Sequence, residues 1–205
     1  MARKATGLLS LLFLLSTGCA LTQANLKVGY DPAKTPKSAL STAGPMTVSV
    51  AEFVDKRPEK DKIGYKRNGF GQKMAPIVTV KPVPQITREA ISGEFAKNGF
   101  AVDAPAADAA LTGSIDSFWL DIQMNFATIE FMGTVGVDVT LTDTRTGVVR
   151  YTGKYEGHCN EKSLGGLEGT WERVMNTALE NMIRDMSADR KLVESLTSIV
   201  RAKSP

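Results

Sequence analysis

A long run of alternating apolar and polar residues constrains the fold of this chain more than any other feature of the sequence. Between residues 127 and 141 the odd positions are almost all apolar and the even positions are mostly polar. Successive side chains of a strand point to opposite faces, so this pattern predicts one strand with a buried face and a wet face. The strand is about three times the usual length of five or six residues, and we therefore expect a bend at Gly133 or Gly136.

The sequence after this strand predicts a hairpin. Residues 143–147 read Asp-Thr-Arg-Thr-Gly, which is typical of a hairpin loop. Val149, Tyr151 and Tyr155 then resume the buried phase. We therefore expect two long antiparallel strands side by side.

Shorter strands are predicted before this hairpin. The strand at 109–121 carries Ile115 and Trp119 on one phase. The strand at 46–54 changes phase near Ala51, where we expect a bulge. The remaining predicted strands are 77–80 and 100–102.

Helical periodicity marks three further elements. Apolar residues at helical spacing begin after residue 84 and end at an Asn-Gly stop at 98–99. The strongest pattern spans 167–186, about five turns, and burial of its apolar stripe would contribute about 15 kcal/mol before entropy is subtracted. A last helix follows, capped by Ser187 or Asp189. These elements predict an α+β fold: an antiparallel-rich sheet with a long hairpin, helices packed on one face and two C-terminal helices.

The first eighteen residues have the properties of a targeting signal. Arg3 and Lys4 provide a positive start, and residues 8–15 form an apolar run broken by Ser10. This run is too short to span a bilayer. We therefore expect the signal to be removed by cleavage.

The end of this signal, Leu15-Ser16-Thr17-Gly18-Cys19, resembles the lipobox cut by the lipoprotein signal peptidase. The resemblance implies that Cys19 becomes a lipidated N-terminus carrying palmitate-type acyl chains. Lipoboxes usually have Leu three residues before the cysteine, where this chain has Ser16. Ala20 stands where inner-membrane retention signals usually place Asp, so the resemblance implies sorting to the outer membrane, with the domain facing the periplasm. The alternative is an ordinary secretory signal cut near Ala20 or Ala24.

The sequence divides into three regions. Residues 1–18 are the predicted lipoprotein signal peptide, residues 19–45 the lipidated N-terminus and a flexible tether, and residues 46–205 a single α+β domain. The tether prediction rests on Pro32 and Pro36 and on the absence of a sustained apolar period. A flexible coil of that length spans about 25 to 30 Å.

Residues with catalytic potential are few. His158 is the single histidine and adjoins Cys159, but adjacent side chains of a strand point to opposite faces, so we expect no nucleophile and base pair. One histidine and one further cysteine supply too few nitrogen and sulfur ligands for zinc. Gly69 and Gly71 lack the rest of a phosphate-loop pattern and predict a turn. We therefore expect no catalytic residue, no metal ion and no cofactor.

A basic stretch is the one local charge asymmetry. Residues 55–73 hold seven basic and three acidic side chains, and we treat this stretch as a candidate contact surface for lipid phosphates or an acidic partner. The alternative is a solvated loop. Without Arg3 and Lys4, the 25 basic residues fall to 23 against 22 acidic ones, so nucleic acid is not an expected partner. The candidate surface comprises Lys56, Arg57, Lys60, Lys62, Lys66 and Arg67.

Several short motifs resemble those of the YajG-type family of uncharacterised envelope lipoproteins. They are the Cys19 segment, Asp55-x-Arg57, Leu111-x-Gly113-x-Ile115, the alternating hairpin, and a terminal helix pattern with Ala178-Leu179, Ile183-x-Asp185-Met186 and Asp189. The resemblance covers most of residues 46–200. It implies a Gram-negative envelope location and no established activity. More distantly, the plan is similar to small periplasmic lipoproteins that serve secretion, flagellar or lipid-transport assemblies.

These observations support three hypotheses for function. The first is a membrane-anchored lipoprotein that acts as a non-catalytic binding or structural module with an envelope protein partner. The second is an accessory lipoprotein of a lipid, lipopolysaccharide or secretion assembly that uses the basic stretch. The third, a hydrolase, depends on the unfavourable His158 and Cys159 pair. The oligomeric state and the identity of the partner stay open.

Overall fold

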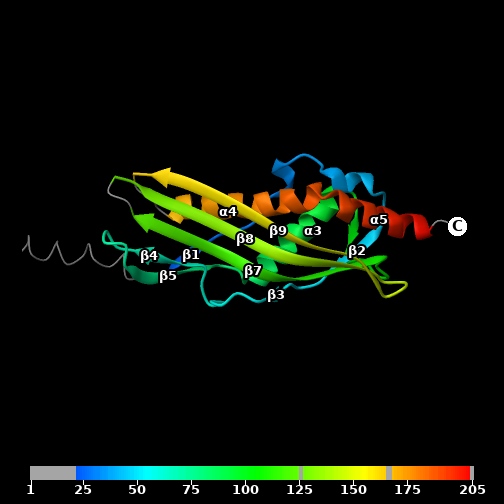
Figure 1. Cartoon of the computed structure of the whole chain (residues 1–205), viewed down its shortest axis with the longest axis horizontal. Helices are drawn as coiled ribbons and strands as arrows, with labels where there is room; N and C mark the ends of the chain where they lie inside the picture. The colour runs from blue at the N-terminus through cyan, green and yellow to red at the C-terminus, as the bar shows by residue number, and fades with distance from the viewer. Residues whose placement is uncertain (1–21, 125–126, 165–167, 204–205) are drawn as a thin grey trace, which may run out of the picture.

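The computed structural model describes residues 22–124, 127–164 and 168–203, and within these ranges nine strands form one mixed sheet and three α-helices pack against it (Figure 1). The elements are β1 (Ala24–Leu26), η1 (Pro32–Lys34), η2 (Ala39–Thr42), β2 (Thr47–Val50), β3 (Val54–Asp55), β4 (Gly64–Arg67), β5 (Lys73–Thr79), α3 (Val83–Lys97), β6 (Ala101–Val102), β7 (Ala109–Met124), β8 (Ile129–Asp143), β9 (Val148–Ser163), α4 (Glu168–Ala188) and α5 (Arg190–Lys203).

Three long antiparallel strands dominate the sheet. β7 pairs with β8 along its whole length, from Ala109 opposite Asp143 to Met124 opposite Ile129. β8 in turn pairs with β9, and Ile129 lies opposite Ser163. The predicted long strand and its hairpin are confirmed, and the odd positions of β8 are buried from Phe131 onward. The prediction that Val149 lies on the buried phase is wrong: it is 54% exposed, because the register of β9 with β8 shifts between Leu141 and Thr142.

A β-bulge interrupts β7 at Asp116. The register with β8 shifts between Ile115 and Ser117, so the extra residue reverses the alternation of the side chains. Ile115 is buried before the bulge and Phe118 after it, whereas Trp119 lies on the open face. The prediction that Trp119 shares the buried phase of Ile115 is therefore wrong. The shift lies opposite Gly136, one of the two glycines at which a bend was expected.

The other edge of β7 carries parallel strands, so the sheet is only largely antiparallel. β2, β3 and β4 all pair with β7 in parallel. Val48 lies opposite Ala109 and Val54 opposite Ser114, so six steps along one strand match five along the other. The extra residue lies between β2 and β3, where the sequence predicted a phase change.

The helices cover the buried face of the sheet. α3 packs against β2 and β3, α4 packs against β8 and β9, and the two helices contact each other. α4 approaches β9 at Gly157, where an added Cβ atom would lie 2.0 Å from the carbonyl oxygen of Ala178. α5 begins after Asp189, whose Oδ1 accepts a hydrogen bond from the Lys191 amide over 2.8 Å, so Asp189 is the cap. No helix in the described ranges is both long and apolar enough to cross a bilayer.

Residues 22–45 are folded, which corrects the prediction of a flexible tether over 19–45. β1 adds to the sheet edge beside β5, where Ala24 lies opposite Ile77. Leu26 and Leu40 are fully buried in the same core as the helices and the long strands. The segment lacks a regular apolar period because its few apolar residues enter the core one at a time. The predicted signal peptide and Cys19 lie outside the described residues.

Candidate functional site

Arg57 anchors the loop between β3 and β4. Its side chain is 4% exposed and faces the Asp55 carboxylate, with Nε 3.0 Å from Oδ1 and Nη2 2.8 Å from Oδ2. It also donates to the carbonyl oxygens of Lys60, Lys62 and Phe118 over 3.0, 2.9 and 3.3 Å. One guanidinium group therefore ties together both ends of the loop and strand β7. We call this arrangement the Asp55–Arg57 clasp.

The electrostatics of the clasp follow from its burial. Burial alone raises the pKa of Asp55, but the hydrogen bonds and positive charge of Arg57 outweigh it and hold that pKa below its ordinary value. Arg57 satisfies its donors with a carboxylate and backbone carbonyls, as a buried guanidinium must. The Asp-x-Arg motif therefore has a structural role.

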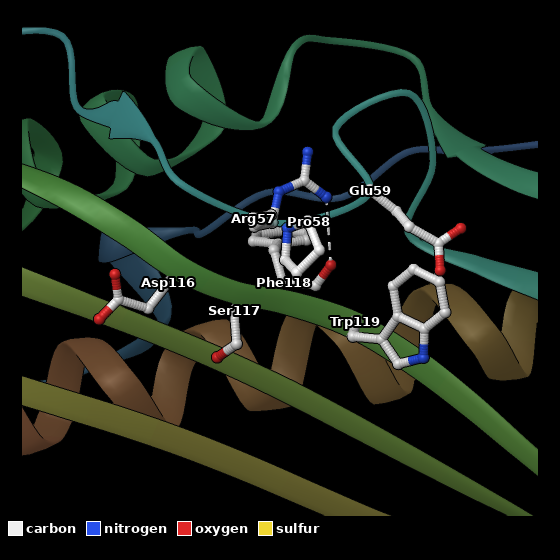
Figure 2. A pocket seen from close by; sticks show the side chains of 7 residues that line it. All are labelled: Arg57, Pro58, Glu59, Asp116, Ser117, Phe118 and Trp119. Carbon is white, nitrogen blue, oxygen red and sulfur yellow. Dashed lines mark hydrogen bonds between the residues drawn. The ribbon is translucent and has the colours of Figure 1, made fainter.

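A hollow of about 200 Å³ opens beside the clasp on the open face of the sheet. It lies at the β7 bulge, which directs Asp116 and Ser117 outward, and Trp119 lies further along the strand near Glu59 (Figure 2). The Trp119 ring meets the Tyr65 ring edge to face, with 6.1 Å between ring centroids. The lining residues are Arg57, Pro58, Glu59, Asp116, Ser117, Phe118 and Trp119.

Charges of both signs border this hollow. Lys154 lies 2.9 Å from Asp116, and its hydrogen bond and charge hold the pKa of Asp116 below the ordinary value. On the other side Glu59 accepts a hydrogen bond from the Tyr65 hydroxyl over 2.9 Å and lies 3.0 Å from Lys62. The hollow combines a partly exposed indole with three charged groups that already have partners, Arg57, Glu59 and Asp116.

The six residues of the predicted contact surface do not form one patch. The prediction is wrong for Arg57, which is buried. Lys62 and Arg67 are partly buried and pair with acidic side chains, Arg67 with Asp121 over 2.9 Å. Lys66 lies 3.7 Å from Glu168 in α4. Lys56 and Lys60 are the members of the set that are exposed.

His158 and Cys159 lie on opposite faces of β9, as predicted. The imidazole is exposed and lies 3.3 Å from the Thr134 hydroxyl. Cys159 is partly buried against the core, and burial raises the pKa of its thiol. In the parts of the chain that the structure describes, no group of three or more His, Cys, Asp or Glu side chains is arranged to hold a metal ion.

A family model described as uncharacterized lipoprotein matches residues 33–197. The chain belongs to this family, the YajG-type lipoproteins. The match confirms the resemblance seen in the motifs, and it begins inside the segment that the sequence predicted to be a tether. A lipoprotein family indicates a location in the cell envelope. No curated protein sequence matches this chain.

A solved structure shares the fold of this YajG-type chain. Protein XCC0632 from Xanthomonas campestris has a TM-score of 0.58 at 14% identity, over 86% of this chain and 98% of that one. A proposed lipoprotein of Caulobacter crescentus has a TM-score of 0.43 at 14% identity, with coverages of 82% and 96%. Lipoprotein GNA1162 from Neisseria meningitidis has a TM-score of 0.31 at 15% identity, with coverages of 66% and 96%. The first of these similarities shows a shared fold.

Sequence reasoning missed the hollow, although a signal for it exists. In the first part of this strand the apolar residue Ile115 is at an odd position. In the second part the apolar residues Phe118, Leu120 and Ile122 are at even positions. That change of phase predicts an extra residue near 116 and an outward Trp119. The clasp and the pairing of the basic residues depend on contacts between separate strands, which the local pattern does not encode.

Proposed function

We propose that this YajG-type chain is a non-catalytic docking lipoprotein, acylated on Cys19, held in the outer membrane and facing the periplasm. Its partner is an envelope protein that binds in the hollow beside the Asp55–Arg57 clasp. The lipoprotein family and the cysteine that follows a short apolar run support the anchor. The outward Trp119 in a hollow on the open face is the observation that supports docking.

The chemistry of the hollow favours a protein partner. Trp and Tyr are enriched at the centres of protein interfaces because they offer a large contact area for little loss of conformational entropy. Trp119 and Tyr65 already hold each other in place, and the clasp fixes the loop that carries Pro58. A partner would therefore meet a preformed surface rather than order a flexible one.

The two other hypotheses have less support. An accessory role in lipid transport or secretion through the basic stretch is weakened because Arg57 is buried and Lys62 and Arg67 are paired. A hydrolase that uses His158 and Cys159 is opposed by their placement on opposite faces of β9.

Site-specific photo-crosslinking in intact cells tests the docking role. A benzoylphenylalanine side chain replaces Pro58 at the edge of the hollow, and a matched control places it at Thr152 on the open face of β9. We expect a discrete adduct from position 58, weaker in a Trp119→Ala background with an unchanged far-ultraviolet circular dichroism spectrum. Equal adducts from both positions, or a yield indifferent to Trp119→Ala, would reject the hollow as the docking site.

A further inference from the structure

The chain enters the described structure at one end of the sheet. β1 runs parallel to β5 with Ala24 opposite Ile77, so the chain before Ala24 comes from the side of the β4–β5 turn at residues 68–72. Cys19 precedes Thr22, the first described residue, by three residues, which span at most about 11 Å. An acyl group on Cys19 would therefore hold this end of the sheet close to a membrane.

Three segments that are distant in sequence meet at this end. β4 runs parallel to β7 with Gly64 opposite Leu120, so the β4–β5 turn lies beside the last residues of β7. Met124 at the end of β7 lies opposite Ile129, and Ile129 lies opposite Ser163 near the end of β9. We call this the β4–β5 end of the sheet; β4, β5 and the arrowhead of β9 lie on its side of the molecule in Figure 1.

The two most exposed large apolar side chains of the described ranges are at this end. Phe70 in the β4–β5 turn is 92% exposed and Leu164 after β9 is 88% exposed, whereas the other exposed large apolar residues lie between 49% and 61%. The turn presents Phe70 in a defined conformation, because Asn68 Oδ1 accepts hydrogen bonds from the amides of Phe70 and Gln72, each over 3.0 Å. Two apolar side chains therefore project from the end that the anchor would hold nearest to lipid.

The charges at this end do not form a strong cationic surface. Arg67 pairs with Asp121, and Lys66 lies near Glu168. Lys73 lies over the Tyr65 ring with Nζ 4.7 Å from the centroid. Attraction to lipid would therefore come mainly from Phe70 and Leu164, since exposed aromatic and aliphatic side chains favour the membrane interface.

We propose that the β4–β5 end rests on the membrane surface and that Phe70 and Leu164 insert at the level of the lipid headgroups. This inference rests on the acyl anchor of the proposed function. The three residues from Cys19 to Thr22 span at most about 11 Å, so the anchor and the two side chains together fix the orientation of the domain. The hollow at Ser117 lies seven residues along β7 from Met124, which places it roughly 23 Å above the lipid surface.

Depth-dependent fluorescence quenching tests this orientation. The full mature protein, purified from membranes, is reconstituted in vesicles of phosphatidylethanolamine and phosphatidylglycerol that contain lipids with a nitroxide near the headgroup. Phe70→Trp and Leu164→Trp carry the probe, and Val149→Trp is the control at the far end of β9, about 50 Å away along the strand. The unsubstituted protein gives the emission of Trp119 and Trp171, which is subtracted.

We expect blue-shifted and quenched emission for Phe70→Trp and Leu164→Trp, and neither change for Val149→Trp. Intact mass measurement of each sample shows whether Cys19 carries acyl chains. If the protein is acylated and the three probes are quenched equally, or none is quenched, the orientation is wrong and the anchor stands. If the mass shows no lipid, the anchor fails and the orientation fails with it.

Discussion

The hydroxyl of Tyr30 donates a hydrogen bond to the carboxylate of Glu94 over 2.6 Å, and this bond joins the N-terminal segment to α3. Glu94 is 1% exposed and also accepts from Asn98 Nδ2 over 2.9 Å, with Lys97 Nζ 2.6 Å away. The segment that the sequence predicts to be a tether is therefore held by a hydrogen bond to a buried carboxylate as well as by the pairing of β1 with β5.

Tyr30→Phe should destabilise the protein by about 2 kcal/mol, because a buried carboxylate loses one charge-assisted hydrogen bond. The free energy of unfolding in urea measures this change. Tyr65→Phe is the matched control, since its hydroxyl donates to Glu59, whose side chain is 40% exposed, and a much smaller change is expected. Equal losses from the two variants would show that the Glu94 contact has no special weight.

Arg57→Lys should destabilise the protein by about 2 to 3 kcal/mol, because a lysine cannot form the two parallel bonds to Asp55 or reach the three carbonyl oxygens. Arg67→Lys serves as the control, since Arg67 is more exposed and bonds to one carboxylate and the carbonyl of Gly71. Urea denaturation again provides the measurement. If the two substitutions cost the same, the clasp does not organise the loop.

Acid should weaken the protein through Glu94. Burial raises the pKa of Glu94, but the bonds from Lys97 and Tyr30 outweigh it, so the pKa in the folded state lies below the ordinary value of 4.5. The unfolded chain then binds the proton more readily, and the stability from this group is present above about pH 4.5 and is lost as the pH falls through the folded-state pKa. Urea unfolding at pH values from 7 to 3 should show this loss. The free energy of unfolding should depend less steeply on pH for Glu94→Gln than for the exposed control Glu52→Gln. Identical slopes would contradict the assignment.

Gly157→Ala should destabilise the protein by about 3 kcal/mol, because the new methyl group would meet the backbone of α4. Thermal unfolding followed by circular dichroism measures this effect. Gly69→Ala is the control, since no atom lies within 4 Å of its added Cβ. A neutral Gly157→Ala would mean that α4 can move away from β9 at little cost.

Acylation should depend on one residue. Labelled palmitate should be incorporated into the wild-type protein and not into the Cys19→Ala variant, because the resemblance to a lipobox implies that Cys19 is the residue that is lipidated. Gel autoradiography after metabolic labelling gives the result. Incorporation into both proteins at the same level would move the modification elsewhere in the chain.

The regular elements could be predicted because each repeats a local period. The odd positions of β8 are buried from Phe131 onward, and the apolar stripe of α4 is buried from Trp171 to Met186, as the two patterns predict. The bulge at Asp116 adds one residue and reverses the alternation of side chains. Because the local pattern continues the alternation past this point, it wrongly predicts that Trp119 is buried. The parallel pairing of β2, β3 and β4 with β7 joins segments far apart in sequence, and no local period records it.

The prediction of a flexible tether in the N-terminal segment is wrong for a different reason. Two prolines and a mixed composition are typical of a linker, yet Ala24 and Leu26 each occupy a core position beside β5. The prediction that Arg57 belongs to an exposed contact surface is wrong for the same reason. Arg57 is buried because it pairs with Asp55 against strand β7, and that strand is distant in the sequence. Burial of a single side chain is decided by the assembled sheet.

The position of β7 between β8 and the three parallel strands has a consequence for the order of folding. β2, β3 and β4 precede β7 in the chain and pair with it, so they cannot complete their hydrogen bonds until residues 109–124 are available. Pairings of long sequence separation slow the folding of a domain because loop closure precedes the gain in contacts. The chain must therefore be synthesised through residues 109–124 before the centre of the sheet can form.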